Sequence, residues 1–392
     1  MRVTPAVPPN GGSSSDRRDL SSTGSLPSPS APPGSAPWQP RVSVIICAYT
    51  EKRWAQLTAA VHSCLAQRRA PEQVILVVDH NADLLRRARE AFPAAGFPAV
   101  EVVANRYRRG LSGARNTGVE RATGDIVAFL DDDARADEDW IEHLVAPYAD
   151  PAVQGTGGSV VAEWSGGRPS WFPPEFDWVV GCGYPGLPTS VAQIRNPIGA
   201  GMSVRRAVFE TVGGFSDGIG RIGATPLGCE ETEFFIRLHQ RVPGARVLHV
   251  PDARVTHLVT AERASWAYFA RRCYAEGLSK AAVSRRVGAG PALSAERAYL
   301  RSTLPRGLAR DLASPGRWAR AGAILAGTSL TGLGYARGLL ARPAPPPASG
   351  MTPAEKGPAA EVPVEAMWSG ELELADSRAD LSAAGGGRAG DT

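Results

Sequence analysis

Cysteine is too scarce in this chain to build a disulfide or zinc framework. The five cysteines lie far apart, form no C-x-x-C pair, and are odd in number. We therefore expect reduced thiols that pack among other side chains. They are Cys47, Cys64, Cys182, Cys229 and Cys273.

Other signals are missing as well. The formal net charge is only +4, so the field of the whole molecule does not call for nucleic acid, and we expect no nucleic-acid partner. The N-terminal region has no continuous apolar stretch before a small-residue cleavage site, so we expect no secretory signal and a cytoplasmic location. No internal repeat with a period of about 20 to 50 residues is visible.

Large apolar residues are also few at the two ends. Residues 1–40 are rich in Pro, Ser and Gly, and residues 342–392 in Pro, Ala, Gly and charged residues. Such segments bury too little apolar surface to offset the entropy lost on ordering. We predict disordered tails on either side of a folded region.

The folded region opens with alternating strands and helices. Short apolar runs at Val42–Ala48, Gln73–Val78, 100–103 and 126–130 suit parallel strands buried on both faces. Between the first two, apolar residues recur at helical spacing from Trp54 to Leu65. The progression predicts an α/β fold with a Rossmann-like, mostly parallel sheet flanked by helices.

Polar residues follow three of these strands. In open parallel sheets the carboxyl ends of the strands meet at one edge, where ligands bind. An acidic turn or helix cap explains a single acidic strand end more often than a site does, but three such ends favour a site. The residues at this predicted edge are Tyr49, Glu51, Asp79, His80, Asn81, Asp131, Asp132 and Asp133.

The acidic triplet after the fourth strand is the strongest candidate for metal binding. From an extended backbone, side chains at i and i+2 point the same way, so Asp131 and Asp133 can share one cation. Carboxylates suit Mg²⁺ or Mn²⁺ completed by diphosphate oxygens and water. The alternative is an Asp-rich turn that caps a helix starting near Asp137.

Several segments together carry a family resemblance. In this order, the chain contains VSVIICAYTE from residue 42, VVDHN from 77, RGLSGARNTGVERATGDIVAFLDDDA from 109, GAGMSVRRAVFETVGGF from 199 and CEETEFFIRL from 229. From residue 41 to about 300 the sequence resembles glycosyltransferase family 2, the inverting enzymes of the GT-A fold, and among them transferases of the polyprenyl- or dolichyl-phosphate type. The resemblance implies a GT-A catalytic domain over 41–260, with a nucleotide-binding half (41–135) and an acceptor half (136–260). A C-terminal helical region (261–341) follows.

The resemblance also implies roles for matching residues. Asp79 would accept a hydrogen bond from the base, Arg115 would lie near the diphosphate, and Asp133 would bind the metal. Flanking glycines at 110, 113 and 118 and the fork of a guanidinium agree with that role for Arg115, although a surface arginine is the alternative. The remaining donor-binding residues would be Ala48, Tyr49, Glu51, Asp131 and Asp132.

Glu230 and Glu231 open an amphipathic helix and are the candidate catalytic acids. In the family this pair is usually Glu-Asp, and its second acid is the general base, here Glu231. The side chain of Glu231 is one methylene longer than the usual aspartate. The alternative is that both carboxylates only stabilise the helix N-terminus.

His257 follows a predicted strand over 245–250 and a turn, and it resembles the family histidine that approaches the metal. A histidine that satisfies a core hydrogen bond is the alternative. On the acceptor side, aromatic residues between Trp164 and Trp178 predict either a sugar- or lipid-binding surface or a small satellite core.

Residues 321–336 are uncharged but shorter than the roughly 20 residues needed to cross a bilayer. With the arginines before them they suit peripheral attachment to an anionic cytoplasmic leaflet, or else an ordinary helix that covers the catalytic domain.

Taken together, the sequence predicts transfer of a sugar from a nucleoside diphosphate donor, in particular a UDP-sugar, with Mg²⁺ or Mn²⁺. The acceptor would be a glycan, a polyprenyl phosphate or another hydroxyl compound at the membrane. The alternatives are a nucleotidyltransferase, which would need a Gly-rich phosphate loop after the first strand, and a non-catalytic sugar-nucleotide or glycan-binding module. The interpretation requires Asp133 and Glu231 to open into one cleft.

Overall fold

The computed structural model describes residues 38–221 and 227–341. From Pro40 onward, the described residues belong to a single compact unit. The predicted tails at 1–40 and 342–392 lie almost wholly outside the described residues. The predicted boundaries inside the unit, at 135 and 260, stay predictions.

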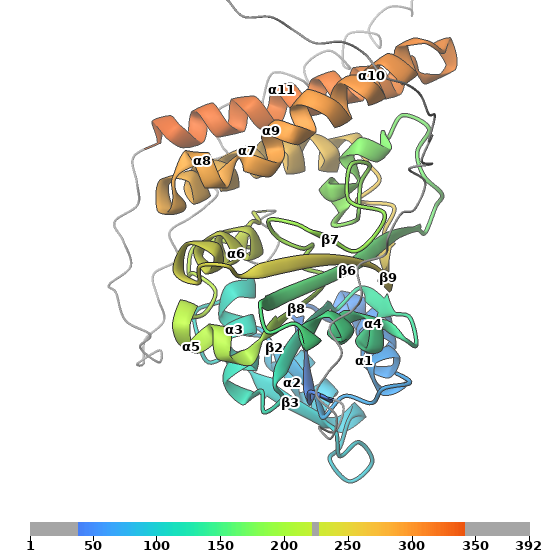
Figure 1. Cartoon of the computed structure of the whole chain (residues 1–392). Coiled ribbons are helices and arrows are strands. Elements are labelled where there is room, and N and C mark those ends of the chain that lie inside the picture. The colour runs from blue at the N-terminus through green and yellow to red at the C-terminus, as the bar shows by residue number, and fades with distance from the viewer. Residues whose placement is uncertain (1–37, 222–226, 342–392) are drawn as a thin grey trace, which may run out of the picture. The chain divides into compact units, whose positions relative to one another are not determined.

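A nine-stranded sheet forms the centre of this unit, with the order β3-β2-β1-β4-β8-β6-β9-β5 and β7 paired to β9 (Figure 1). Its strands are β1 (Val42–Ala48), β2 (Gln73–Val78), β3 (Val100–Ala104), β4 (Ile126–Asp131), β5 (Ala134–Ala136), β6 (Val153–Trp164), β7 (Ala192–Gln193), β8 (Gly201–Arg205) and β9 (Arg246–Val259). The predicted α/β class is confirmed. The first four strands pair in parallel as expected, whereas β8 runs antiparallel to β4 and β6, which makes the whole sheet mixed.

The parallel strands form where the sequence is continuously apolar. In β1, Ile45 faces one side of the sheet and Val44 and Ile46 face the other, and all three are at most 1% exposed. Both faces are therefore covered, as in other parallel sheets. β1 lies between β2 and β4, which brings Ala48 opposite Val78 and Cys47 opposite Asp131. This register gathers the carboxyl ends of the strands at one edge.

The part of the sheet around β6 depends on close approaches that need glycine. A Cβ on Gly155 would lie 2.5 Å from the Phe235 ring, and one on Gly158 would collide with the Ala253 carbonyl oxygen. β9 is a single strand from Arg246 to Val259, although its register with β6 shifts between Gly158 and Ser159. The predicted strand over 245–250 is present as the first part of β9, but the predicted turn after it is wrong. The residues around Pro251, which has no N–H to donate, form an irregularity and the strand continues.

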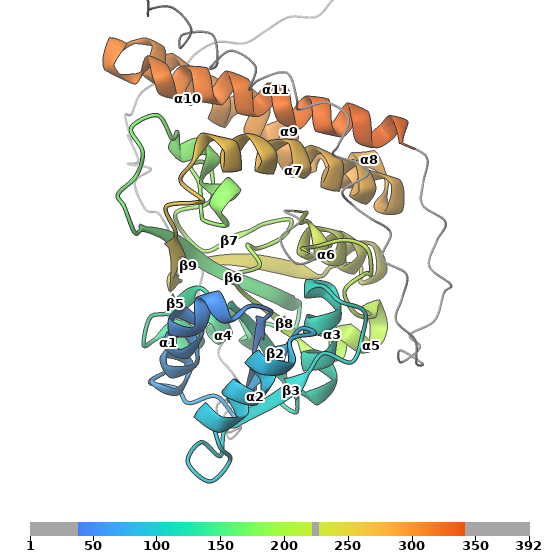
Figure 2. The ribbon, with the colours of Figure 1, turned by 180° about the vertical axis from the view of Figure 1, so that it is seen from behind.

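Helices cover both faces of the sheet (Figures 1 and 2). α1, α2 and α4 pack on one face, and α3, α5 and α6 pack on the other. The helices are α1 (Trp54–Leu65), α2 (Ala82–Ala91), α3 (Leu111–Arg121), α4 (Trp140–Val145), α5 (Arg206–Val212), α6 (Glu230–Arg241), α7 (Trp266–Val287), α8 (Ala289–Ala292), α9 (Ser294–Ala298), α10 (Leu304–Leu312) and α11 (Trp318–Leu340). Short 3₁₀ segments are η1 (Glu51–Arg53), η2 (Ala146–Ala149), η3 (Pro174–Val180) and η5 (Pro315–Arg317), and η4 (Tyr299–Thr303) is a π segment.

The predicted apolar helix over 321–336 is part of the longer α11. α11 lies along α7 (Figure 2), and glycines allow the two helices to touch: Gly277 faces the backbone of Thr331 and Tyr335, and Gly334 faces Tyr274. Among the described residues, no helix is long and apolar enough to cross a membrane.

Replacing Gly334 with alanine should separate these two helices. The new Cβ would collide with the Tyr274 carbonyl oxygen, and overpacking of this kind costs about 1 to 3 kcal/mol. Gly322→Ala is the matched control, because a Cβ there meets nothing within 4 Å, and it should stabilise the helix by up to about 1 kcal/mol. Urea unfolding of both variants measures the difference. Equal stability of the two would contradict this account of the α7–α11 packing.

The aromatic stretch between Trp164 and Trp178 forms a satellite core. Phe172 and Phe176 are at most 1% exposed and pack against Phe269 of α7, with ring centroids 5.3 Å away in both cases. Of the two predicted alternatives, the satellite core describes most of this stretch. Trp178 also lines the pocket described below.

Candidate active site

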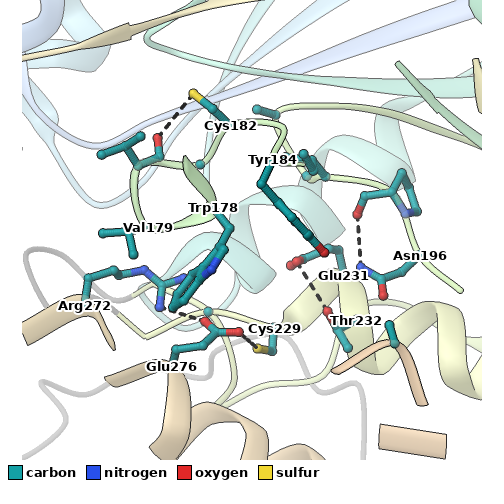
Figure 3. Close-up of a pocket in the computed structure, with 18 of the residues that line it drawn as sticks. Trp178, Val179, Cys182, Tyr184, Asn196, Cys229, Glu231, Thr232, Arg272 and Glu276 are labelled. Atoms are coloured by element: carbon teal, nitrogen blue, oxygen red, sulfur yellow. Dashed lines mark hydrogen bonds and ion pairs between the residues drawn. The ribbon is translucent and has the colours of Figure 1, made fainter. Parts of the chain in front are cut away.

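A pocket of about 860 Å³ lies between the carboxyl ends of the parallel strands and the C-terminal helices (Figure 3). It brings together nearly all of the residues predicted from the sequence. Those that line it are Ala48, Tyr49, Asp79, Arg115, Asp131, Asp132, Asp133, Glu230, Glu231 and His257. Three of the predicted residues do not line the pocket: Glu51, which is exposed in η1, and His80 and Asn81, which follow Asp79. Asp133 and Glu231 therefore do share one cleft.

The acidic triplet is not wholly extended, as the i and i+2 argument assumed. Asp131 is the last residue of β4, and Asp132 and Asp133 form a turn into β5. Asp131 and Asp133 nevertheless converge. With His257 they place one ligand atom each within 4.8 Å of one another.

Asp133 is the most heavily paired of the three acids. One oxygen lies 3.0 Å from His257 Nε2, and the other lies 3.1 Å from both Arg53 and Arg263. Burial alone would raise the pKa of the Asp133 carboxyl, but His257 and the two guanidinium groups hold it well below its usual range. Burial likewise opposes a charged His257, but Asp133 raises the pKa of that imidazole to about 10.

Two carboxylates and an imidazole are a donor set that fits a divalent cation. His257 also has a buried Nδ1 atom without a hydrogen-bond partner among the described residues. It extends from β9, opposite Ala134 of β5, which explains how residues far apart in sequence meet here. Asp131, Asp133 and His257 are therefore the residues that would hold the ion.

Asp132 points elsewhere. Its Oδ1 accepts a 2.7 Å hydrogen bond from Arg53, and burial raises the pKa of its carboxyl to about 6. The predicted alternative, in which the acidic triplet caps a helix that starts near Asp137, does not occur. The nearest helix, α4, begins at Trp140 instead of near Asp137, and its N-cap is Asp139.

Arg115 is not a surface arginine, since only 2% of it is exposed. One nitrogen lies 2.8 Å from Glu230 and the other lies 3.7 Å from Asp131. Gly199 makes room for it, because a Cβ there would lie 2.9 Å from Arg115 Nη2. Arg115 thus bridges the acidic edge of the sheet and the start of α6, a role that the sequence did not predict.

The paired acids at the start of α6 have different surroundings. Glu230 is neutralised by Arg115, whereas Glu231 forms no ion pair within the described residues. Burial and the neighbouring Glu230 raise the pKa of Glu231 to about 8. Glu231 accepts a hydrogen bond of 3.5 Å from the Thr232 hydroxyl, and it lines the same pocket as Trp178, Tyr184 and Asn196 (Figure 3). Glu231 is the acid that is free to accept a proton.

At the other end of the pocket, Asp79 is 5% exposed and accepts hydrogen bonds from Asn105 Nδ2 at 2.6 Å and from the Gly110 amide at 3.0 Å. Burial raises the pKa of its carboxyl in spite of these bonds. Ala48 is the last residue of β1 and Tyr49 follows it, and both line the pocket as well.

Comparison with known proteins identifies the family. Residues 43–213 match the family model Glycosyl transferase family 2. The chain is 36% identical over 241 residues to a glucosyl-dolichyl phosphate glucuronosyltransferase of Haloferax volcanii, which covers 61% of this chain and 76% of the relative. The chain belongs to glycosyltransferase family 2.

Other similarities are more partial. A mouse polypeptide N-acetylgalactosaminyltransferase 15 is 34% identical over 113 residues, which is 28% of this chain but only 18% of that protein. A solved mannosyltransferase from Pyrobaculum calidifontis, in complex with GDP-Man and Mn²⁺, is 21% identical, covers 76% of this chain and 88% of that one, and has a TM-score of 0.49.

The family membership makes this chain a glycosyltransferase and an enzyme, as predicted. It therefore decides against the nucleotidyltransferase and against the non-catalytic binding module as descriptions of the chain.

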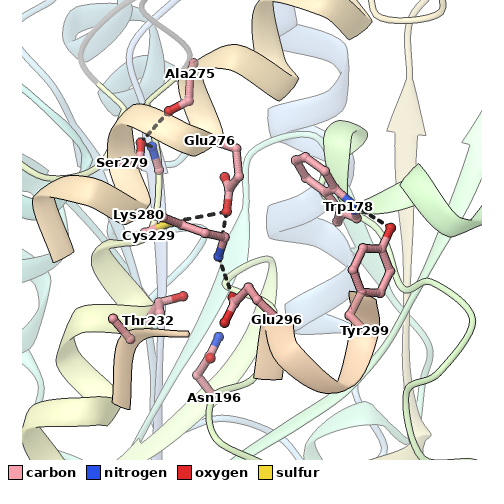
Figure 4. A network of polar contacts seen from close by, with 12 residues as sticks. Trp178, Asn196, Cys229, Thr232, Ala275, Glu276, Ser279, Lys280, Glu296 and Tyr299 are labelled. Atoms are coloured by element: carbon pink, nitrogen blue, oxygen red, sulfur yellow. Dashed lines mark hydrogen bonds and ion pairs between the residues drawn. The ribbon is translucent and has the colours of Figure 1, made fainter. Parts of the chain in front are cut away.

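The C-terminal helices of this glycosyltransferase supply much of the pocket wall, which the sequence did not reveal. A chain of ion pairs crosses it: Arg195 to Glu296 at 2.6 Å, Glu296 to Lys280 at 2.5 Å, and Lys280 to Glu276 at 3.0 Å. Figure 4 shows the two pairs made by Lys280. Glu276 also accepts from the thiol of Cys229 at 3.3 Å, directly before the acidic pair of α6.

This chain of charges joins α7 and α9 to the loop before β8 and to the beginning of α6. One sequence pattern could have predicted part of this chain of ion pairs. Glu276 and Lys280 are an i, i+4 pair within an otherwise largely uncharged stretch of α7, a pattern that indicates a buried ion pair.

Proposed function

We propose that this glycosyltransferase moves a sugar from a UDP-sugar to a hydroxyl group of a lipid-linked acceptor, with inversion at the anomeric carbon. The observation that carries the proposal is the placement of Glu231. Among the described residues it has no cationic partner, and it lies in the pocket that also contains Asp131, Asp133 and His257.

In the proposed mechanism, Glu231 and the cation site act at opposite ends of one displacement reaction. Glu231 takes the proton of the acceptor hydroxyl as that oxygen attacks the anomeric carbon. Asp131, Asp133 and His257 hold the divalent cation, which when bound would neutralise charge on the departing nucleoside diphosphate. Arg115 fixes the relative positions of these ends, because it is paired with Asp131 and with Glu230.

The donor follows from the surroundings of Asp79. Its carboxylate lies at the edge of the sheet beside Ala48 and Tyr49, where a nucleobase would be held, and it offers acceptor oxygens to a base N–H. The Haloferax volcanii relative is named a glucuronosyltransferase and the Pyrobaculum calidifontis structure contains GDP-Man. Neither name specifies uridine, and we propose a uridine donor on the resemblance to transferases of the polyprenyl- or dolichyl-phosphate type.

A lipid-linked acceptor is supported by the apolar part of the pocket wall. Trp178, Leu187, Ile198, Tyr299 and Leu304 line it with aromatic and aliphatic side chains. The same relative is named for a glucosyl-dolichyl phosphate substrate. We therefore place the enzyme at the cytoplasmic face of a membrane.

The test is a thermal-shift panel of UDP, GDP and dTDP sugars, each with and without Mn²⁺. A ligand that binds only the folded state raises the apparent stability, by about 2.7 kcal/mol at a concentration one hundred times its Kd. We expect a UDP-sugar to raise the melting temperature only when Mn²⁺ or Mg²⁺ is present. A larger shift with GDP-sugars would contradict the uridine donor, and no shift with any nucleotide would contradict the assigned site.

A further inference from the structure

Exposed large apolar side chains concentrate on the C-terminal helices. Along α11, Trp318, Leu325, Leu333 and Leu340 are 59%, 55%, 60% and 84% exposed. They are spaced by about two helical turns and so form one stripe, which we call the α11 stripe. The opposite side of α11, with Ile324, is buried against the satellite core.

The surroundings of the α11 stripe are positively charged. Over residues 266–341, the acids are Glu276, Glu296 and Asp311, and each is held in an ion pair. None of these three acids is exposed. The exposed arginines over the same residues that form no ion pair in the described part of the chain are Arg271, Arg285, Arg286, Arg297, Arg301, Arg306, Arg317 and Arg337.

The pocket reaches this surface. Gly332 of α11 is exposed beside Leu333 and also lines the pocket. Leu300 of η4, which is 50% exposed, also lines the pocket, and so does the exposed Arg306 of α10. One margin of the pocket is therefore made of residues from the surface that carries the α11 stripe.

We propose that the α11 stripe and the arginines around it dock the enzyme on an anionic lipid bilayer, with α11 parallel to the membrane plane. Leucine and tryptophan side chains enter the interface between headgroups and acyl chains, and arginines bind anionic headgroups. A nucleic acid would be attracted to the arginines but would gain little from exposed leucines.

This docking also explains the position of the pocket margin at Gly332 and Leu300, since a lipid-linked acceptor can then reach Glu231 without leaving the bilayer. That part of the inference rests on the proposed function. The docking itself depends only on the surface.

Co-sedimentation of the full chain with vesicles tests the proposal. We expect binding to phosphatidylcholine vesicles that contain about 30 mol % phosphatidylglycerol, weaker binding at high salt, and little binding to pure phosphatidylcholine. The double variant Leu325→Ser/Leu333→Ser should bind at least about tenfold more weakly. Arg317→Gln/Arg337→Gln should also weaken binding, by up to about thirtyfold, because each arginine near such a surface is worth roughly 1 kcal/mol, or about fivefold in binding.

Val161→Ser/Val191→Ser is the matched control, because these valines are 41% and 56% exposed outside the C-terminal helices. It should bind vesicles like the unaltered enzyme. Melting temperatures of all variants should be alike, since every altered side chain is exposed.

Three outcomes would overturn the proposal. The unaltered enzyme could stay in the supernatant, the control could lose as much binding as the stripe variant, or the stripe variant could turn a dimer into a monomer without changing vesicle binding. Displacement from vesicles by duplex DNA at low molar excess would instead favour a nucleic-acid surface. Hydrolysis of UDP-sugars with Mn²⁺ in the absence of vesicles tests the proposed function separately from the docking. If the enzyme binds vesicles but does not hydrolyse UDP-sugars, the proposed function fails and the docking stands.

Discussion

Glu231→Gln should reduce kcat by about 10² to 10⁴, because general base catalysis contributes a factor of that size. Donor binding should survive, since the proposed mechanism has Glu231 contact the acceptor, and Glu231 forms no ion pair in the described structure. Steady-state kinetics and the UDP-sugar melting shift measure the two properties separately. Glu231→Asp is the informative companion, because an aspartate there restores the family pattern, and it should retain far more activity than the glutamine variant. A glutamine variant with normal kcat would remove Glu231 from the role of base.

The pH dependence has a definite sign. Burial and Glu230 raise the pKa of Glu231 to about 8, so the base is deprotonated only at higher pH. We expect kcat/KM to fall as the pH drops below about 8, and the residual rate of Glu231→Gln to lack this dependence. Rates that stay constant from pH 9 to pH 6 in the unaltered enzyme would contradict this assignment.

The raised pKa of Glu231 also makes folding stability depend on pH, with the opposite sign: activity should rise with pH, whereas this contribution to stability should fall. A buried carboxyl with a raised pKa favours the folded state below its unfolded pKa, and this contribution is lost as the pH rises to about 8. Glutamine stays neutral, so the stability of Glu231→Gln relative to the unaltered enzyme should increase with pH up to about 8. Melting temperatures across that range provide the measurement, and they would also show that loss of turnover is not loss of fold.

The sequence predicts well those features that are determined by residues close to one another in the chain. The strands Val42–Ala48 and Gln73–Val78 have the predicted bounds, because a parallel strand buried on both faces must be a continuous apolar run. The acids that follow such strands meet at one edge for a topological reason. Asp79, Asp131 and Asp133 were therefore predictable as a group.

Features that depend on distant partners were not predictable. β6 contains Gly155, Gly157 and Gly158, which read as a loop until Phe235, Pro197 and Ala253 are known to lie against them. The pair of Arg115 and Glu230 joins residues 115 positions apart. No local pattern distinguishes such an arginine from one that binds a diphosphate.

The difference between the two acids of α6 shows the same limit more sharply. Glu230 and Glu231 are identical in sequence terms, and only the family pattern favours the second as the base. In the structure Arg115 neutralises the first and leaves the second unpaired. The physical reason for the assignment thus comes from a residue on another helix.

Asp133→Asn should abolish metal-dependent turnover, with a loss in kcat of at least about 10², comparable to removing a group that stabilises transition-state charge. Asparagine keeps the shape of the side chain but offers a neutral oxygen or an amide to the cation. Asp132→Asn is the matched control, because Asp132 points to Arg53 and is not one of the three residues whose ligand atoms converge. The melting shift caused by Mn²⁺ with UDP should disappear in the first variant and persist in the second.

Asp133 also neutralises Arg53 and Arg263, so the first variant should melt at a lower temperature even without metal. The comparison therefore uses the metal-induced change for each variant and not its absolute melting temperature. An unchanged Mn²⁺ response in Asp133→Asn, or its loss in Asp132→Asn alone, would show that the cation is held by other residues.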